Sequence, residues 1–350
     1  MNFIREIFAI PFGYALHVLY SLNIDYIVSL ILITLVVRVA LLPSSIKQQK
    51  NSAKQMRLQA KVNKIRQKYA GNNSRENQMK ISEETQELYK REGFNATTQG
   101  CAPLIITLVV MMGLYGAIYA PISKVIGIKG DELTAIEAAY ESVAAEGDDS
   151  SKKTNNTYRI ELDVMGSFDK VTAAIEGNEE WSKAVKKENL EKISDFIRDF
   201  RIFGIDLTST PSEEYKAYKE TGKTPDGANI IGCILMPVFA GISALLTSLY
   251  TYLKQRKTNP EMAKNPAMGC MTFMSPLISV VFAWTLPAGI GFYWIISGLL
   301  SFIQTVALGI ALKPEAIIAG QMIDETVERR SREKSVKERN AILAKHNSEN

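Results

Sequence analysis

The sequence predicts an all-α, polytopic membrane protein with five transmembrane helices, a cytoplasmic helical hairpin and an external helical insertion. Three observations predict this class. Five apolar runs recur along the 350 residues, and several approach the roughly 20 residues that cross a bilayer as a helix. The connections between runs alternate between basic and acidic composition. A long polar segment rich in Asp and Glu separates the second run from the third.

The predicted transmembrane helices span residues 25–43, 99–121, 229–253, 270–285 and 286–312. Their orientation follows from the loops, because Lys and Arg near span ends are retained in the cytoplasm. Segment 44–98 has 12 basic and 5 acidic residues, and segment 254–269 has 4 and 1, so both are predicted to be cytoplasmic. Segment 122–228 has 15 basic and 22 acidic residues, a net charge of −7, which suits the external side. The N-terminus is then outside, and the charged tail 313–350 is cytoplasmic.

Residues 1–24 are predicted to form an external interfacial helix. The stretch from Phe3 to Leu22 is apolar, but Arg5, Glu6 and Pro11 interrupt it. No small-residue cleavage pattern follows, which argues against a cleaved signal peptide. A sixth span over residues 3–22 is the alternative, because of its apolar length.

Segment 44–98 is predicted to be a helical hairpin, with arms over 45–69 and 75–91 separated by a cluster of Gly and Asn. Its narrow apolar seam is predicted to pair Met56, Ala60, Ile65 and Tyr69 with Met79, Ile81, Leu88 and Tyr89. The first arm is basic, with Lys47, Lys50, Lys54, Arg57, Lys61 and Lys64. These charges have two interpretations: retention charge for topology, and a surface for anionic lipids or ribosomal RNA.

The external loop 122–228 contains predicted helices over 132–145 and 179–203. A modest apolar stripe, consisting of Trp181, Val185, Leu190, Ile193, Phe196 and Ile197, is enough for a small helical subdomain but not for a large core. We expect the insertion 130–199 to be peripheral and to modulate function rather than perform it.

Arg38 lies in an apolar run that is otherwise free of charge. An arginine at a helix centre costs about 3 kcal/mol or more, so such residues usually face a bundle interior or a wet cavity. If the span begins at Tyr26, Arg38 is about 18 Å along it at 1.5 Å per residue. Two interpretations stay open: a side chain that snorkels to the cytoplasmic interface, and a buried functional group.

Other polar residues in the spans recur at helical spacing. Thr34 shares a face with Arg38, Ser243 with Thr247, and Trp294 with Ser297 and Gln304. For the Ser and Thr residues taken by themselves, interhelical hydrogen bonding is a sufficient explanation. If the polar stripes of neighbouring spans face one another around Arg38, however, they would form a hydrated groove in the inner half of the membrane.

Catalytic and metal chemistry is not indicated. The two histidines, His17 and His346, lie at opposite ends of the chain, and the three cysteines have no C-x-x-C spacing. No P-loop pattern occurs. A Ser-Lys dyad of Ser44 or Ser45 with Lys47 lacks any second supporting motif. We therefore expect no enzyme activity, no metal and no cofactor.

Several short motifs match, in order, the YidC family of membrane protein insertases, which has mitochondrial and chloroplast relatives. They are PFG (11–13), TLVVRVALLP (34–43), IKQQK (46–50), LYKREGFN (88–95), GCAPL (100–104), GIDLT (204–208), LPAG (286–289) and YW (293–294). The chain resembles this family over about 240 residues. Departures include Thr107 and Thr247, which stand where relatives often carry glutamine, and an external segment about 70 residues longer than usual.

The resemblance implies an energy-independent insertase of the bacterial cell membrane. Arg38 matches the family's groove arginine, and the hairpin matches its substrate-receiving hairpin. The substrate groove is then expected to comprise Arg38, Thr34, Thr107, Ser243, Thr247, Trp294, Ser297 and Gln304. Expected partners are nascent membrane proteins, the ribosome, the Sec translocon and the lipid bilayer, with no small-molecule substrate. The alternatives are a secondary transporter that uses Arg38 for an anionic solute and a structural assembly factor without groove activity.

Overall fold

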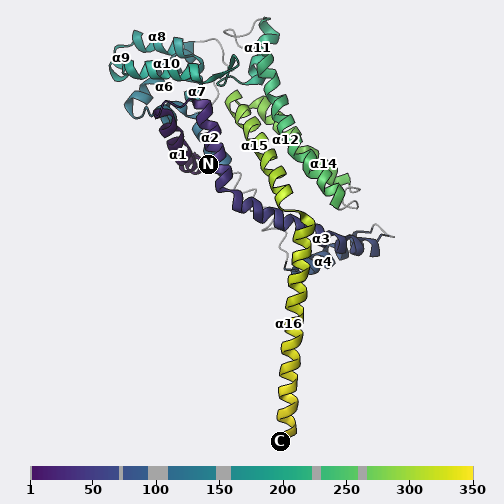
Figure 1. Cartoon of the computed structure of the whole chain (residues 1–350). Coiled ribbons are helices and arrows are strands. Elements are labelled where there is room, and N and C mark those ends of the chain that lie inside the picture. The colour runs from purple at the N-terminus through teal and green to yellow at the C-terminus, as the bar shows by residue number, and fades with distance from the viewer. Residues whose placement is uncertain are drawn as a thin grey trace. The chain divides into compact units, whose positions relative to one another are not determined.

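The structure is a computed structural model, and it is mostly helical (Figure 1). It describes residues 2–70, 74–93, 109–146, 159–222, 230–258 and 266–349. The chain divides into two compact units. The first comprises Met1–Leu41, Leu104–Gln255 and Ala263–Gln304, and the second comprises Leu42–Pro103, Arg256–Met262 and Thr305–Asn350.

Two helices in the described part of the chain are long and apolar enough to cross a membrane: α12 (Ile230–Thr258) and α15 (Ala288–Ala311). A third candidate combines α2 (Tyr26–Ala40) with the helix that follows it. Shorter apolar helices occupy Val109–Tyr119, part of α1 (Asn2–Ser21) and part of α14 (Pro266–Thr285). These helices confirm a helical membrane protein, while the total of five spans stays a prediction.

The starts of α2 and α15 are determined by capping contacts. Asp25 caps α2, because its Oδ1 accepts the N–H groups of Ile27 at 2.8 Å and Val28 at 3.3 Å. At α15, the N–H groups of Ala288 and Gly289 donate to main-chain carbonyls of the Leu207–Ser209 segment at 2.7 and 2.8 Å. Each helix therefore begins with donors that are already satisfied.

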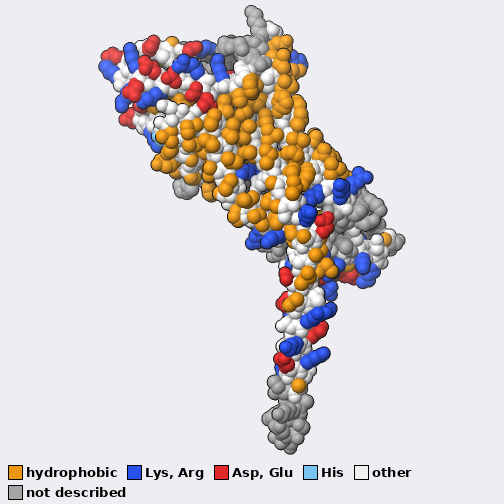
Figure 2. All heavy atoms as spheres, in the orientation of Figure 1, with side chains coloured by type: hydrophobic (Ala, Val, Ile, Leu, Met, Phe, Trp, Pro, Cys, Tyr) orange, Lys and Arg blue, Asp and Glu red, His pale blue; other side chains and the backbone are white. Residues whose placement is uncertain are grey.

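Small residues bring the apolar helices together. A Cβ atom at Gly298 of α15 would meet the Ser243 Oγ of α12 at 2.4 Å, and one at Gly241 of α12 would meet the Val280 Cγ2 of α14 at 2.4 Å. Close helix approach through small side chains is the usual packing mode in a membrane. The outward face of these helices is covered by hydrophobic side chains (Figure 2), among them Phe239, Leu246, Leu277 and Val281.

The described part of segment 122–228 contains more and shorter elements than the sequence predicted. After the π-helix η1 (Ile122–Ile126) come α6 (Asp131–Glu146), α7 (Ile160–Gly166), α8 (Phe168–Gly177), α9 (Glu179–Ala184) and α10 (Lys187–Asp199). Strands β1 (Arg201–Ile202) and β2 (Ile205–Asp206) form an antiparallel hairpin, followed by α11 (Pro211–Thr221). The predicted helix 179–203 is thus wrong: it breaks at Val185, whose extended backbone separates α9 from α10 and whose side chain is buried.

The helices of segment 122–228 share one core with α1 and α2, which differs from the expected peripheral subdomain. The Phe196 ring of α10 lies 5.2 Å from both Tyr20 and Tyr26, measured between ring centroids. Phe200 packs on Tyr26 at 4.9 Å. Tyr26 is fully buried by these contacts at the first turn of α2. The insertion consequently covers the start of a predicted span.

The second unit contains α3 (Leu42–Lys68), α4 (Arg75–Arg91) and α16 (Pro314–Glu349). Helix α3 packs against both α4 and α16, and Leu58, Val62 and Leu88 are buried. The predicted seam is partly wrong, since Met79 is 59% exposed. The side chain of Ala60 lies outside the described residues. Ion pairs reinforce the α3/α4 contact, as set out below.

Candidate functional site

Arg38 lies in the last turn of α2 and is half-buried. Its Nη2 donates two hydrogen bonds to Ser297 of α15, one to the main-chain oxygen and one to Oγ, both at 2.8 Å. The buried phenol of Tyr293, one turn earlier on α15, is close to both residues. The guanidinium is thus directed toward a neighbouring helix, which favours the inward-facing interpretation over snorkelling.

Two predicted groove hydroxyls are satisfied within their own helices. Thr34 Oγ1 donates to the Leu30 carbonyl at 2.6 Å, and Ser243 Oγ donates to the Ala240 carbonyl at 2.8 Å. Both residues are only 2% exposed. This bonding to a preceding carbonyl uses the hydroxyl proton locally. In this structure, Ser243 therefore serves the close α12/α15 contact at Gly298.

Thr247 differs from Ser243, one turn earlier on α12. Its Oγ1 is buried and has no hydrogen-bond partner in the described part of the chain. A buried hydroxyl without a partner costs about 1–3 kcal/mol. Thr247 is thus the one α12 residue of the predicted set whose hydroxyl has no hydrogen-bond partner among the described residues, and that hydroxyl is itself buried.

Trp294 belongs to an aromatic cluster and is half-buried. Its ring centroid lies 5.5 Å from that of Phe282 on α14 and 6.4 Å from that of Tyr115 on the helix Val109–Tyr119. Gln304 is half-buried two turns beyond Ser297 on α15. Thr107 lies outside the described residues. Of the predicted groove set, the structure thus brings Arg38 and Ser297 into direct contact.

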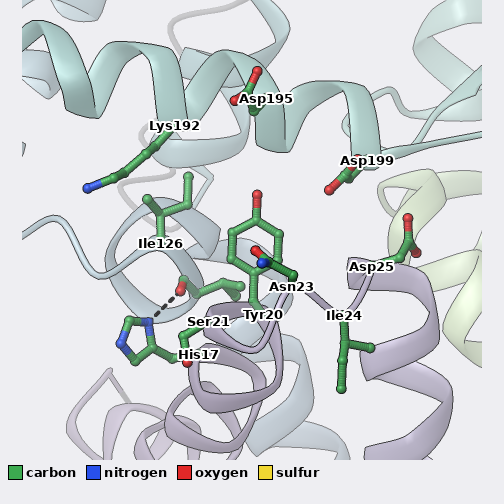
Figure 3. Close-up of a pocket in the computed structure, with 11 residues that line it drawn as sticks. His17, Tyr20, Ser21, Asn23, Ile24, Asp25, Ile126, Lys192, Asp195 and Asp199 are labelled. Carbon is green, nitrogen blue, oxygen red and sulfur yellow. Dashed lines mark hydrogen bonds between the residues drawn. The ribbon is translucent and has the colours of Figure 1, made fainter.

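The structure also has a pocket that sequence reasoning did not find (Figure 3). It has a volume of about 520 Å³ and lies where the end of α1 and the start of α2 face α10. Asp25, Asp195 and Asp199 line it together with Tyr20 and Lys192. Burial, followed by these three carboxylates, raises the pKa of Tyr20 to about 12. Arg38 is not among the lining residues, so this pocket is a separate feature.

No metal centre is formed by the described residues: no group of three or more His, Cys, Asp or Glu side chains there could hold an ion. His17 instead contacts the main chain, with Nδ1 2.7 Å from the Val125 carbonyl (Figure 3). The other histidine, His346, has a side chain outside the described residues.

In the second unit, two of the six predicted hairpin cations are already paired. Glu92 binds Arg57 at 3.1 Å and Lys61 at 2.5 Å. Hydrogen bonding to Lys61 keeps the pKa of Glu92 below its ordinary value. The remaining four, Lys47, Lys50, Lys54 and Lys64, form no ion pair among the described residues, and all but Lys54 are exposed.

A second set of ion pairs lies at the other end of α3. Lys68 Nζ and the Tyr69 hydroxyl both reach Glu84, at 2.7 and 2.5 Å. Glu84 and Glu92 thus serve the α3/α4 contact, whereas Glu76 pairs with Lys80 within α4.

Comparison with known proteins assigns the family. The sequence profile of the 60Kd inner membrane protein family matches residues 18–313. The chain belongs to this family. It is 34% identical over 94 residues to membrane protein insertase MisCA of Bacillus subtilis, and 39% identical over 99 residues to membrane protein insertase YidC of Alkalihalophilus pseudofirmus. It is 38% identical over 104 residues to the chloroplastic inner membrane protein ALBINO3 of Arabidopsis thaliana.

These relatives confirm the resemblance to YidC-type proteins. The matched stretches cover 27%, 28% and 30% of this chain, and 35%, 39% and 20% of the respective relatives. The chain therefore matches between 20% and 39% of the length of each of these relatives. Family membership rests on the profile match, which covers most of the chain.

Proposed function

We propose that this chain is a membrane protein insertase that receives nascent membrane proteins in a hydrated groove beside Arg38. The observation that carries the proposal is the contact of Arg38 with Ser297, since it holds a positive charge on the inner side of α2, against α15. The relatives MisCA and YidC are membrane protein insertases by name, which supports the same activity for this chain. No bond is broken in such a reaction, so the protein is not an enzyme.

The physical basis is a shortened apolar barrier. Water around Arg38 in the inner half of the membrane reduces the distance over which a client's polar segment must leave water. The fixed guanidinium attracts acidic client segments electrostatically. The client's apolar helix then passes along α12 and α15 into lipid, and its removal from water drives the step.

The proposed topology has five spans, an outer N-terminus and a cytoplasmic C-terminus. The hairpin of α3 and α4 then lies in the cytoplasm, and its unpaired cations Lys47, Lys50, Lys54 and Lys64 face anionic lipid or the ribosome. Helix α1 lies on the outer surface of the membrane, where its exposed apolar residues Ile10, Tyr14 and Val18 contact lipid. The proposed partners include the Sec translocon.

Depletion rescue tests the proposal. Cells depleted of their own insertase would express this chain, and the insertion of a small single-span client would be scored by protease accessibility. Rescue by the native chain together with loss of rescue in Arg38→Ala is the expected result. A chain that accumulates in the membrane but inserts none of a panel of clients would contradict the insertase function. Uptake of an anionic solute by vesicles that contain it would instead favour the transporter alternative.

A further inference from the structure

One arginine of the insertion 130–199 holds the connection 207–210, which leads from β2 to α11. Arg159 lies directly before α7 and is half-buried. Its Nε donates to the Asp163 carboxylate at 2.8 Å, which fixes the guanidinium against α7. Its Nη1 donates to the Thr210 hydroxyl at 2.7 Å, and its Nη2 donates to the Thr208 carbonyl at 3.4 Å. Both threonines are buried, so the connection is bound from the side of the insertion by this one side chain.

The same connection binds the first turn of α15. The Ala288 N–H donates to the Ser209 carbonyl at 2.7 Å, and the Gly289 N–H donates to the Leu207 carbonyl at 2.8 Å. A Cβ atom at Gly289 would lie 3.2 Å from that Leu207 oxygen, so a larger residue there would displace the connection. Arg159 contacts the residues on either side of Ser209. Its position therefore determines where the acceptors for the start of α15 lie.

The start of α2 is tied to the start of α15 through the β1–β2 hairpin. The Phe200 ring packs on Tyr26, in the first turn of α2, with 4.9 Å between ring centroids. The Phe200 carbonyl accepts the Leu207 N–H at 3.2 Å, and the Leu207 carbonyl accepts the Gly289 N–H. Two residues that flank the hairpin thus join the first turns of the two helices.

Further along the same two helices, Arg38 of α2 binds Ser297 of α15. Ser297 is about 14 Å along α15 from Ala288, and Arg38 is about 18 Å along α2 from Tyr26, at 1.5 Å per residue. Helices are rigid elements that carry a displacement from one end toward the other. A shift of the connection 207–210 would consequently move Ser297 relative to Arg38.

We infer that Arg159 is a positioning residue for the Arg38–Ser297 contact, a role that rests on the insertase function proposed above. It acts through the connection to which the first turn of α15 is bound. A guanidinium suits this role because it holds several acceptors in one fixed planar geometry. The carboxylates of Asp163 and Glu213, at 2.8 and 3.2 Å, balance its charge. Arg159 therefore orients the connection and does not itself attract a client.

Distances between paired spin labels test this role in the full chain in lipid nanodiscs. Val36→Cys on α2 and Ile303→Cys on α15 are exposed labelling positions. In Arg159→Gln we expect the distance distribution between them to broaden, because helix shifts of about 1–2 Å become accessible. The matched control is Arg198→Gln, since Arg198 is an exposed arginine of α10 that pairs with Asp195 of its own helix. This control should keep the native distribution.

The native cysteines Cys101 and Cys270 would be replaced for this experiment. Cys233 would be retained, because it is fully buried and its Sγ lies 3.3 Å from the Ser209 hydroxyl of the connection. A native distribution in Arg159→Gln would overturn the positioning role. A lower melting temperature without broadening would also overturn it, since that is all a purely stabilising residue would produce.

Thr210→Val provides a second variant, because valine keeps a similar shape but cannot accept the hydrogen bond from Arg159. We expect Thr210→Val to broaden the distribution as well. The two variants remove the same contact, so the double variant should broaden it no more than Arg159→Gln does alone. Additive broadening would show that Arg159 does not act through Thr210.

Client selectivity separates the positioning role from the insertase function. The rate of insertion would be compared for a client with an acidic outer segment and a matched neutral client. The acidic-to-neutral ratio should fall at least about twofold in Arg159→Gln, as for coupled residues, and Arg159→Gln should cause no further fall in an Arg38→Ala background. Equal losses for both clients would overturn the positioning role. A native chain that inserts neither client would contradict the insertase function, while the label distances would still decide the role of Arg159.

Discussion

Arg38 donates two hydrogen bonds from a single nitrogen, Nη2, to Ser297, and thereby joins α2 to α15. The main-chain oxygen of Ser297 accepts one of them, so no substitution at position 297 removes both. Substitution of Arg38 therefore tests the positive charge, and substitution of Ser297 tests the side-chain hydrogen bond alone.

The first prediction uses this separation. Arg38→Ala should impair the insertion of clients with acidic outer segments most strongly, and Arg38→Lys should retain more activity, because its ammonium keeps the charge. Ser297→Ala should have a smaller effect, equivalent to about 1 kcal/mol, since one acceptor remains. Insertion rates in proteoliposomes measure all three. Ser279→Ala is the control, because the Ser279 hydroxyl binds the Ser275 carbonyl of its own helix. Equal activity of Arg38→Ala and the native chain across a client panel would indicate an arginine that only snorkels.

The second prediction concerns the close approach of α12 and α15. Gly298→Ala places a Cβ atom 2.4 Å from the Ser243 Oγ and 2.9 Å from its Cβ. We expect a loss of about 1–3 kcal/mol in the free energy of unfolding, because the helices must separate. The double variant Gly298→Ala with Ser243→Gly should recover much of the loss, which thermal denaturation in detergent would detect. Gly320→Ala in α16, with no atom within 4 Å of the new Cβ, is the control. Additive effects in the double variant would show that the two residues do not contact each other.

The third prediction concerns the dependence of α2 on the external helices. Phe196→Ala should cost about 3–5 kcal/mol, because the Phe196 ring is fully buried against Tyr20 and Tyr26. The same change at Phe203, which is 89% exposed at the β1–β2 turn, should cost less than about 0.5 kcal/mol. Phe203 also has a φ of +49°, an uncommon conformation for a bulky residue. Comparable melting temperatures for the two alanine variants would contradict the shared core.

The same contacts would affect a shortened chain in which a Gly/Ser linker joins Ile128 directly to Ile202 and so deletes most of the insertion. The sequence pattern suggests that the shortened chain still folds and inserts simple clients. Because the deletion removes Phe196 and Phe200 from Tyr26, we expect it to lower the melting temperature sharply. A stable shortened chain that is inactive on every client would make the insertion part of the mechanism.

The fourth prediction tests the orientation. In a Cys-free background, Ser82→Cys on α4 and Ser182→Cys on α9 should react with a membrane-impermeant thiol reagent from opposite sides of the membrane. Both positions are exposed. The nearby Asn178 is a less suitable labelling position, because its side chain caps α9. Labelling of both cysteines from outside intact cells would refute the proposed topology.

The sequence by itself predicted the two hairpin arms to within about three residues of α3 and α4, while the bounds of the five spans stay a prediction. Composition and helical period are local properties, and Asp25 and Ser74 begin α2 and α4 by accepting hydrogen bonds from neighbouring backbone N–H groups. The predicted hairpin arm 75–91 coincides with α4 for this reason. The predicted helix 179–203 failed at Val185, where burial against the rest of the insertion outweighed helical periodicity.

Only the tertiary structure decided which polar side chains meet. Helical spacing places Thr34, Arg38, Ser243 and Ser297 on definite faces, but it does not identify what lies opposite each face. The hydroxyls of Thr34 and Ser243 bind their own helices, whereas Arg38 reaches a residue 259 positions away. Arg159 gave no sequence signal, because its partner Thr210 becomes a neighbour only in the folded chain. Such contacts depend on how helices are arranged in space, which no local pattern encodes.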